Sequence, residues 1–256
     1  MTRSFYSGSI ADFLKNSTDD VIGVLAKNNV FALELTQRMA WNAEIEILRR
    51  VLSDYEGVIL FEYSIPRMGK RIDAIVIIRN VIFILEFKIG DKKFHTNAVD
   101  QVWDYALDLK NFHETSHQHL ISPILVATDA NEVVTKIQTS VHNDKVLIPL
   151  MANSNSLQKI ISEVLGFADG DFIEISKWES GKYSPTPTII EAAMALYSNH
   201  TVEDISRTDA SAVNLSDTSD AISRIITQAR KTNEKVICFV TGVPGAGKTL
   251  VGLDIA

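Results

Sequence analysis

The chain has 256 residues, of which 46% are hydrophobic and 22% are charged, and its formal net charge is −7 at pH 7, which is ordinary for a globular protein. The negative charge argues against a protein that coats nucleic acid by bulk charge, and the single cysteine, Cys238, excludes an intrachain disulfide framework and a cysteine-cluster metal site. No apolar run reaches the roughly 18 residues of a membrane span, and the N-terminal stretch lacks the apolar core of a signal peptide, so we expect a cytoplasmic protein with no membrane partner.

The first part of the chain predicts short helices, one long helix and a strand. Residues 1–35 suggest short helices with polar joints. Residues 41–55 have the spacing of an amphipathic helix, whose stripe is Ile45, Leu48 and Leu52. Residues 57–65 follow as a strand.

Residues 71–88 predict a hairpin that carries charges where a buried sheet should be apolar. A two-residue loop at Arg79-Asn80 pairs Ile78 with Val81 and places Asp73 opposite Glu86. Lys88 then lies on the same face. Opposed like charges are unfavourable, and a divalent cation between the two carboxylates removes the penalty. Basic residues outnumber acidic ones from 67 to 93, which fits a phosphate-binding surface or merely a solvated sheet edge.

Further elements complete a mixed α/β pattern. Residues 97–112 predict a helix, 120–128 and 145–152 predict strands, and 156–167 predict a helix closed by Gly166. The expected fold is a mixed central sheet flanked by helices. Glycine, proline and hydroxyl residues between 169 and 187 suggest a domain boundary. Helices at 186–200 and 221–234, separated by a polar acidic stretch, follow it.

The segment "GVPGAGKT" matches the phosphate-binding loop pattern at every fixed position. A buried parallel strand is expected before it, at residues 236–240, and a helix after it, from 249. The glycines let backbone N–H groups surround a phosphate of ATP, Lys248 reaches the β and γ phosphates, and Thr249 holds Mg²⁺. The alternative is a glycine-rich turn without a ligand. The expected nucleotide-binding residues are Gly242, Gly245, Gly247, Lys248 and Thr249.

The sequence continues for seven residues after Thr249. Nucleotide hydrolysis also needs an acid for Mg²⁺ and a group that positions water, which normally lie on later strands. We therefore expect an N-terminal piece of a longer protein, with at most weak nucleotide binding and no hydrolysis in this piece.

The acids and the lysine of the hairpin resemble the PD-(D/E)xK nuclease superfamily, which has a restriction-endonuclease-like fold. Asp73 matches its first strand acid, and Glu86-Phe87-Lys88 matches E-x-K. Gln101 and Tyr105 match the Q-x-x-x-Y helix pattern of the RecB-like branch, although Ile72 replaces the usual proline.

This resemblance implies hydrolysis of DNA, or less favourably RNA, with Mg²⁺ or Mn²⁺. Asp73, Glu86 and a helix-borne glutamate would bind the metal, and Lys88 would position or activate water. Gln101 and Tyr105 would support the site or touch the phosphate backbone. Glu44 borders the apolar stripe of its helix and is preferred to Glu46, which lies on the polar face. The alternatives are a structural ion pair of Glu86 with Lys88 or Arg71, and a fold that binds nucleic acid without cutting it.

The end of the chain resembles the start of the bacterial DUF2075 helicase-like proteins, which are related to superfamily 1 helicases and to the helicase part of Schlafen proteins. The expected organisation is a nuclease-like domain at 1–184, a helical connector at 185–235 and the start of a P-loop NTPase at 236–256. Such fusions often belong to bacterial defence or repair. A nucleotide-gated regulatory domain of a helicase-like protein is the second alternative.

Other residues receive structural interpretations. His113, His117 and His119 fall in a polar loop without a cysteine partner and are not expected to bind zinc. Trp41, Trp103 and Trp178 are expected in the core rather than stacked on bases. Cys238 is expected to be a small core residue.

Overall fold

The computed structural model describes residues 3–29, 35–65, 70–131, 133, 135–140, 144–183, 209–242 and 248–255. The chain divides into two compact units. The first comprises residues Met1–Lys110 and Gln118–Gly181, and the second comprises Asn111–His117 and Lys182–Ala256. The predicted boundary at residue 184, and the predicted helix at 186–200, lie outside the described residues.

A six-stranded mixed sheet forms the centre of the first unit, which confirms the predicted α/β class. Its spatial order follows the chain from β1 to β6. The pairings from β1 to β4 are antiparallel, and β4–β5 and β5–β6 are parallel. The strands are β1 (Tyr6–Ser9), β2 (Val58–Ile65), β3 (Lys70–Ile78), β4 (Val81–Lys88), β5 (Leu120–Ala127) and β6 (Leu150–Ala152).

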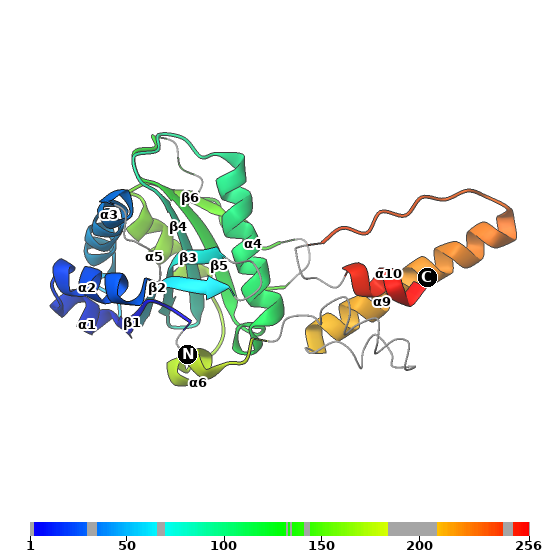
Figure 1. Ribbon diagram of the computed structural model, residues 1–256, viewed down its shortest axis with the longest axis horizontal. Helices are drawn as coiled ribbons and strands as arrows, with labels where there is room; N and C mark the ends of the chain where they lie inside the picture. Colours follow the sequence, from blue (N-terminus) through cyan, green and yellow to red (C-terminus); the bar gives the residue numbers. More distant parts are fainter. Residues whose placement is uncertain are drawn as a thin grey trace. The chain divides into compact units, whose positions relative to one another are not determined.

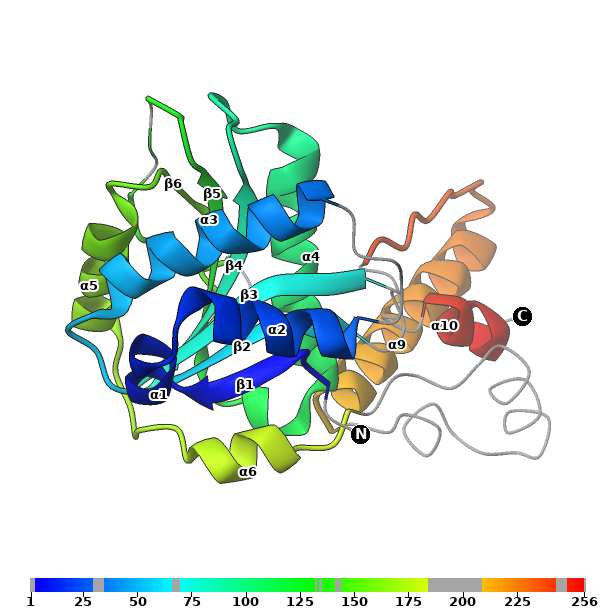
Figure 2. The same ribbon diagram turned by 60° about the vertical axis from the view of Figure 1, so that its left-hand side comes forward.

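Helices cover both faces of the sheet (Figures 1 and 2). On one face, residues of α3 and α5 such as Leu48 and Ile161 pack with Val76 and Phe83 into the main core. Helix α4 covers the other face, where Val102 is fully buried. The helices of this unit are α1 (Ile10–Lys15), α2 (Thr18–Asn28), α3 (Leu35–Leu52), α4 (Thr96–Phe112), α5 (Leu157–Phe167) and α6 (Ile175–Ser180), although the last two residues of α4 belong to the second unit.

The hairpin has the predicted register. Ile78 pairs with Val81, and the pairing continues without a break to Ala74 and Leu85. Arg79, in the two-residue loop, has a φ of 56°, the left-handed conformation that tight hairpin turns require. This register aligns Asp73 with Glu86, at the end where the recorded pairing stops.

Three expectations for the first unit need correction. Strand β1 lies where only short helices were expected, because it pairs with β2 at the edge of the sheet. Gly166 does not close its helix, since α5 ends at Phe167 and the N–H of Ala168 caps it by donating to the Val164 carbonyl. The strand expected at 145–152 is regular only in β6, and isolated bridges such as Ile121–Val146 precede it.

Besides the end of α4 and a 3-10 turn at Glu114–Ser116, the second unit has two described helices, α9 (Asp209–Thr232) and α10 (Lys248–Ile255). The predicted helix at 221–234 is therefore the second half of a longer one, and α10 confirms the helix after the phosphate-loop sequence. The buried strand predicted at 236–240 is wrong: this stretch has no regular structure, and Ile237 and Phe239 are 80% and 85% exposed. Cys238 is likewise exposed rather than in a core. A buried parallel strand needs paired neighbours and cover on both faces, and no described strand pairs with this segment.

Candidate functional site

The predicted site residues of the nuclease-like region lie on three adjoining elements of the first unit. Asp73 is in β3, and Glu86 and Lys88 end β4. Gln101 and Tyr105 lie one turn apart on α4, so they share one face of that helix. The sheet brings the first three residues together, and α4 adds the other two from the face that it covers.

Glu86 is the centre of a hydrogen-bond network. Its Oε1 accepts from Lys88 Nζ at 2.7 Å and from Gln101 Nε2 at 2.9 Å. Gln101 Nε2 also donates to the Tyr105 hydroxyl at 2.7 Å. The other carboxylate oxygen, Oε2, is buried and accepts from no amide, ammonium or hydroxyl group in the described residues. The Asp73 carboxyl lies within reach of a hydrogen bond to Glu86 when one of the two is protonated. A buried polar atom left unpaired is costly, so when both acids are ionised one oxygen of Glu86 needs a donor or a cation.

Asp73 is bonded to the same strand end. Its Oδ2 accepts the backbone N–H of Phe87 at 2.7 Å. This N–H lies between the two charged residues of the E-x-K sequence, so the bond holds the Asp73 carboxylate beside both. The Asp73 side chain thus accepts the backbone amide of Phe87, which lies just beyond the last residue pair of the two strands, Ala74 with Leu85.

The structure distinguishes the two glutamates of α3. Glu44 is buried, with 5% of its surface exposed, and its charge acts on Asp73. Glu46 is exposed and accepts a hydrogen bond from Thr18 Oγ1 at 2.5 Å. Glu44 therefore faces the acids of the sheet, as preferred from the sequence.

Burial and mutual repulsion make these acids hold their protons. Burial, followed by the charges of Glu62 and Glu86, raises the pKa of Glu44 to about 8. Burial and the charges of Glu44 and Glu86 raise the pKa of Asp73 well above its usual range. Burial also raises the pKa of Glu86, although Lys88 opposes the change. Groups with strongly shifted pKa values concentrate at functional sites.

Lys88 stays protonated in this surrounding. Burial favours its neutral form, but the hydrogen bond to Glu86 and the nearby carboxylates outweigh burial and raise its pKa. Its side chain is 32% exposed, compared with 3% for Glu86. The ammonium group therefore lies between the buried acids and the solvent, where an incoming anion can reach it.

Glu62 is a fourth acid of the site, and it was missed in the sequence. Its Oε1 accepts from Trp41 Nε1 at 2.7 Å, and its Oε2 accepts from Arg71 Nε at 2.6 Å. The β2–β3 pairing continues on both sides of it, which aligns Glu62 with Asp73. Its φ of 52° is a left-handed conformation that costs roughly 1–3 kcal/mol in a residue other than glycine. The signal available in the sequence was an acid in the middle of an apolar strand.

The site carries more negative than positive charge. When ionised, the four acids Glu44, Glu62, Asp73 and Glu86 face two cations, Arg71 and Lys88. Two negative charges then remain uncompensated, and one divalent cation would balance them. Carboxylate oxygens are the preferred ligands of Mg²⁺, Ca²⁺ and Mn²⁺, so the donor set fits such an ion.

The side chains are not already arranged as a ligand set. Within the described ranges, no group of three or more His, Cys, Asp or Glu side chains is placed so that it could hold a metal ion. The hydrogen bonds explain this arrangement, because Asp73 Oδ2 is turned to a backbone amide and Glu86 Oε1 to Lys88 and Gln101. Binding a cation therefore requires side-chain rotation at these residues.

Comparisons of the chain with family models, with curated proteins and with solved structures find no match. The function is therefore inferred from the geometry of the site. Every helix in the described part of the chain is too short or too polar to cross a membrane.

The phosphate-loop residues are only partly described. Lys248 Nζ donates to the Gly242 carbonyl at 2.5 Å, and Lys248 and Thr249 begin α10. Gly245 and Gly247 lie outside the described residues. A lysine at the N-terminus of a helix is where a phosphate-binding loop places it, and nucleotide binding at this loop stays a prediction.

The histidines and tryptophans have structural surroundings. His113 is fully buried, and its Nδ1 lies 2.7 Å from Ser116 Oγ. Trp41 and Trp178 are buried as expected, whereas Trp103 is partly exposed on α4.

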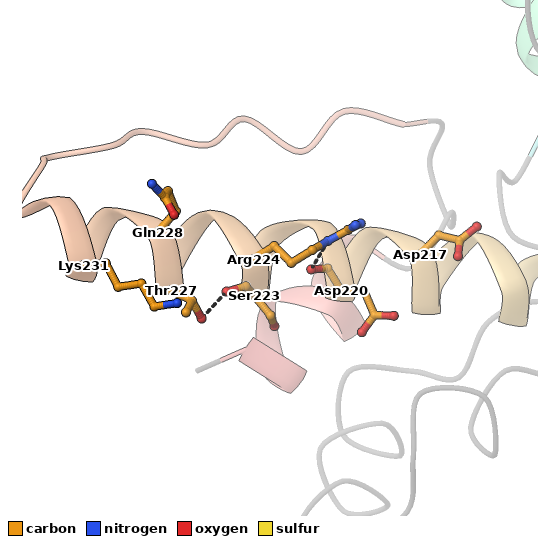
Figure 3. A pocket seen from close by; sticks show the side chains of 7 residues that line it. All are labelled: Asp217, Asp220, Ser223, Arg224, Thr227, Gln228 and Lys231. Atoms are coloured by element: carbon orange, nitrogen blue, oxygen red, sulfur yellow. Dashed lines mark hydrogen bonds between the residues drawn. The ribbon is translucent and has the colours of Figure 1, made fainter.

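A shallow hollow lies along α9 (Figure 3). Its side chains come from one helix, and two of them bond within it: Arg224 Nε donates to the Asp220 carbonyl, and Thr227 Oγ1 to the Ser223 carbonyl. Ligand sites usually combine groups from several elements, so this face has no feature of a binding site. Its lining residues are Asp217, Asp220, Ser223, Arg224, Thr227, Gln228 and Lys231.

Proposed function

We propose that the first unit is a metal-dependent nuclease that hydrolyses phosphodiester bonds of DNA, with RNA as the less favoured substrate. The observation that carries the proposal is the cluster of four carboxylates, Glu44, Glu62, Asp73 and Glu86, which faces the two cations Arg71 and Lys88. Buried carboxylates are retained in proteins when they bind cations or donors. A structural ion pair of Glu86 with Lys88 would account for the presence of Glu86 but not for that of Glu44 and Asp73.

The residues divide the work as follows. Asp73, Glu86 and Glu44 would hold Mg²⁺ or Mn²⁺, which would polarise the phosphate and lower the pKa of bound water. Lys88 stays protonated beside Glu86, so it orients water or stabilises negative charge on the phosphate. Gln101 keeps the carboxylate of Glu86 in place and is itself oriented by Tyr105.

The test is a cleavage assay on single-stranded DNA, double-stranded DNA and RNA with Mg²⁺ or Mn²⁺. Wild type should cut at least one substrate, and Glu86→Gln and Glu44→Gln should reduce the rate at least about 100-fold. Glu46→Gln is the matched control, because it removes an exposed carboxylate from the same helix and should leave the rate unchanged.

Two results would decide against the enzyme. If wild type binds nucleic acid but leaves it intact with either metal, the unit is a binding module. If wild type and Lys88→Ala give the same trace rate, the activity is a contaminant. We also propose that the phosphate loop binds ATP. Labelled ATP and the variant Lys248→Ala test that part separately.

A further inference from the structure

Glu62 has no role in the proposed hydrolysis, yet it is the acid with the most complete set of partners. Both of its oxygens accept hydrogen bonds, from Trp41 at 2.7 Å and from Arg71 at 2.6 Å. Trp41 and Glu62 are buried. Hydrogen bonds to a charged acceptor are about twice as strong as neutral ones, so these two contacts link β2 to α3 and to β3.

Each partner of Glu62 lies beside a candidate metal ligand. Trp41 precedes Glu44 by three residues on α3, so both side chains lie on the same face of the helix. Arg71 precedes Asp73 by two residues on β3, so both side chains lie on the same face of the strand. Glu62 therefore connects, through one carboxylate, the helix and the strand that supply two of the acids.

Additional contacts fix this arrangement. The Arg71 guanidinium lies over the ring of Phe5, 4.8 Å from its centre, which restricts its rotation. The left-handed backbone of Glu62 persists only where surrounding contacts determine it, and such residues concentrate at functional sites. Neither feature is needed to bury apolar surface, because alanine or leucine could occupy the position of Glu62 in β2.

We propose that Glu62 is a positioning residue, which holds α3 against β3 so that Glu44 and Asp73 are spaced for a shared cation. The role in spacing metal ligands rests on the proposed function. The contact by which Glu62 holds α3 against β3 can be tested without metal or substrate. Loss of the Trp41–Glu62 bond should loosen α3 near Glu44 and leave α4 unchanged.

The first experiment is amide hydrogen exchange on the full chain in EDTA. Trp41→Phe removes the indole donor and keeps an aromatic ring, and we expect exchange of α3 amides near Glu44 to accelerate about tenfold. Glu62→Leu should act likewise, and Glu62→Gln, which keeps an amide oxygen for the indole, should act less. Arg38→Gln is the control, because it removes an exposed ion pair of α3 with Asp19, at 3.8 Å. If Trp41→Phe exchanges no faster than this control, the inference is wrong.

The second experiment is a double-mutant cycle on Mn²⁺ binding, measured by the electron paramagnetic resonance signal of free Mn²⁺. Trp41→Phe should weaken binding about tenfold in wild type but less than twofold in Glu44→Gln, because its effect passes through Glu44. Equal losses in both backgrounds would overturn the positioning role. If wild type binds no Mn²⁺, the proposed function fails, and hydrogen exchange alone decides whether Glu62 holds α3.

Discussion

Replacing Glu44 by glutamine should remove a pH-dependent loss of stability from the metal-free first unit. Burial and the charges of Glu62 and Glu86 raise the pKa of Glu44 from 4.5 to about 8. The folded state therefore binds this proton more tightly than the unfolded chain. The stability that Glu44 contributes is complete below pH 4.5 and is lost as the pH rises to about 8. Glutamine keeps the shape and has no charge to lose.

The magnitude follows from the two pKa values. At about 1.36 kcal/mol for each pKa unit, a difference of about 3.5 corresponds to roughly 5 kcal/mol at most above pH 8, and to about 3 kcal/mol at pH 7. Whole domains have unfolding free energies of about 5–15 kcal/mol. We therefore expect Glu44→Gln to be more stable than wild type by at least about 2 kcal/mol at pH 9, and nearly equal to it at pH 4.5.

The assay is urea unfolding in EDTA between pH 4.5 and 9, followed by tryptophan fluorescence. The chain has three tryptophans, Trp41, Trp103 and Trp178, and all of them belong to the first unit, so the signal reports on that unit alone. Glu46→Gln, exposed on the same helix, should follow wild type at every pH. The reasoning is refuted if Glu44→Gln keeps the wild-type pH dependence or is the less stable protein at pH 9.

Further predictions concern the lysines, the cysteine and the cation. Lys88→Met should lower the cleavage rate at least about 100-fold while Mn²⁺ binding, measured by titration, persists. Mn²⁺ should raise the urea midpoint more at pH 9 than at pH 6, because only ionised carboxylates bind it. Cys238 should react with a thiol reagent in the native protein as fast as in urea, since it is exposed; a protected thiol would contradict this structure. Lys248→Ala should abolish the weak ATP binding expected of this chain, as measured with labelled nucleotide.

The hairpin could be predicted in detail because its determinants are local. A two-residue loop fixes the register, and alternation then assigns every side chain to a face. The recorded pairs from Ile78–Val81 to Ala74–Leu85 confirm that reasoning. Glu44 was distinguished from Glu46 by the same kind of argument, because the position of a residue relative to the apolar stripe of a helix determines its burial.

Glu62 could not be predicted in this way. Its role depends on a tryptophan 21 residues earlier and an arginine nine residues later, and no spacing rule relates these three residues. Its backbone conformation is also set by tertiary contacts, since glutamate does not favour a positive φ. The closeness of the Asp73 and Glu86 carboxyl groups is likewise a property of the packed site.

The wrong prediction at 236–240 has a different cause. An apolar run of β-branched residues indicates a strand only if another strand pairs with it, and periodicity contains no information about that partner. The same ambiguity affects Cys238, whose burial was inferred from the apolar character of its neighbours. The first unit contains its own pairing partners, and its strands were therefore predicted more reliably than those of the second.

The energetics of the site favour a cation over a structural ion pair. A buried ion pair gains little net stability, because the desolvation of both charges offsets their attraction. Here Lys88 compensates Glu86 and Arg71 compensates Glu62, which leaves the buried Glu44 and the half-buried Asp73 with raised pKa values. Two such acids reduce stability at neutral pH and add no hydrophobic contact in return. This loss of stability is explained if a cation binds to the carboxylate oxygens. The charges that destabilise the metal-free protein would then stabilise the metal-bound one.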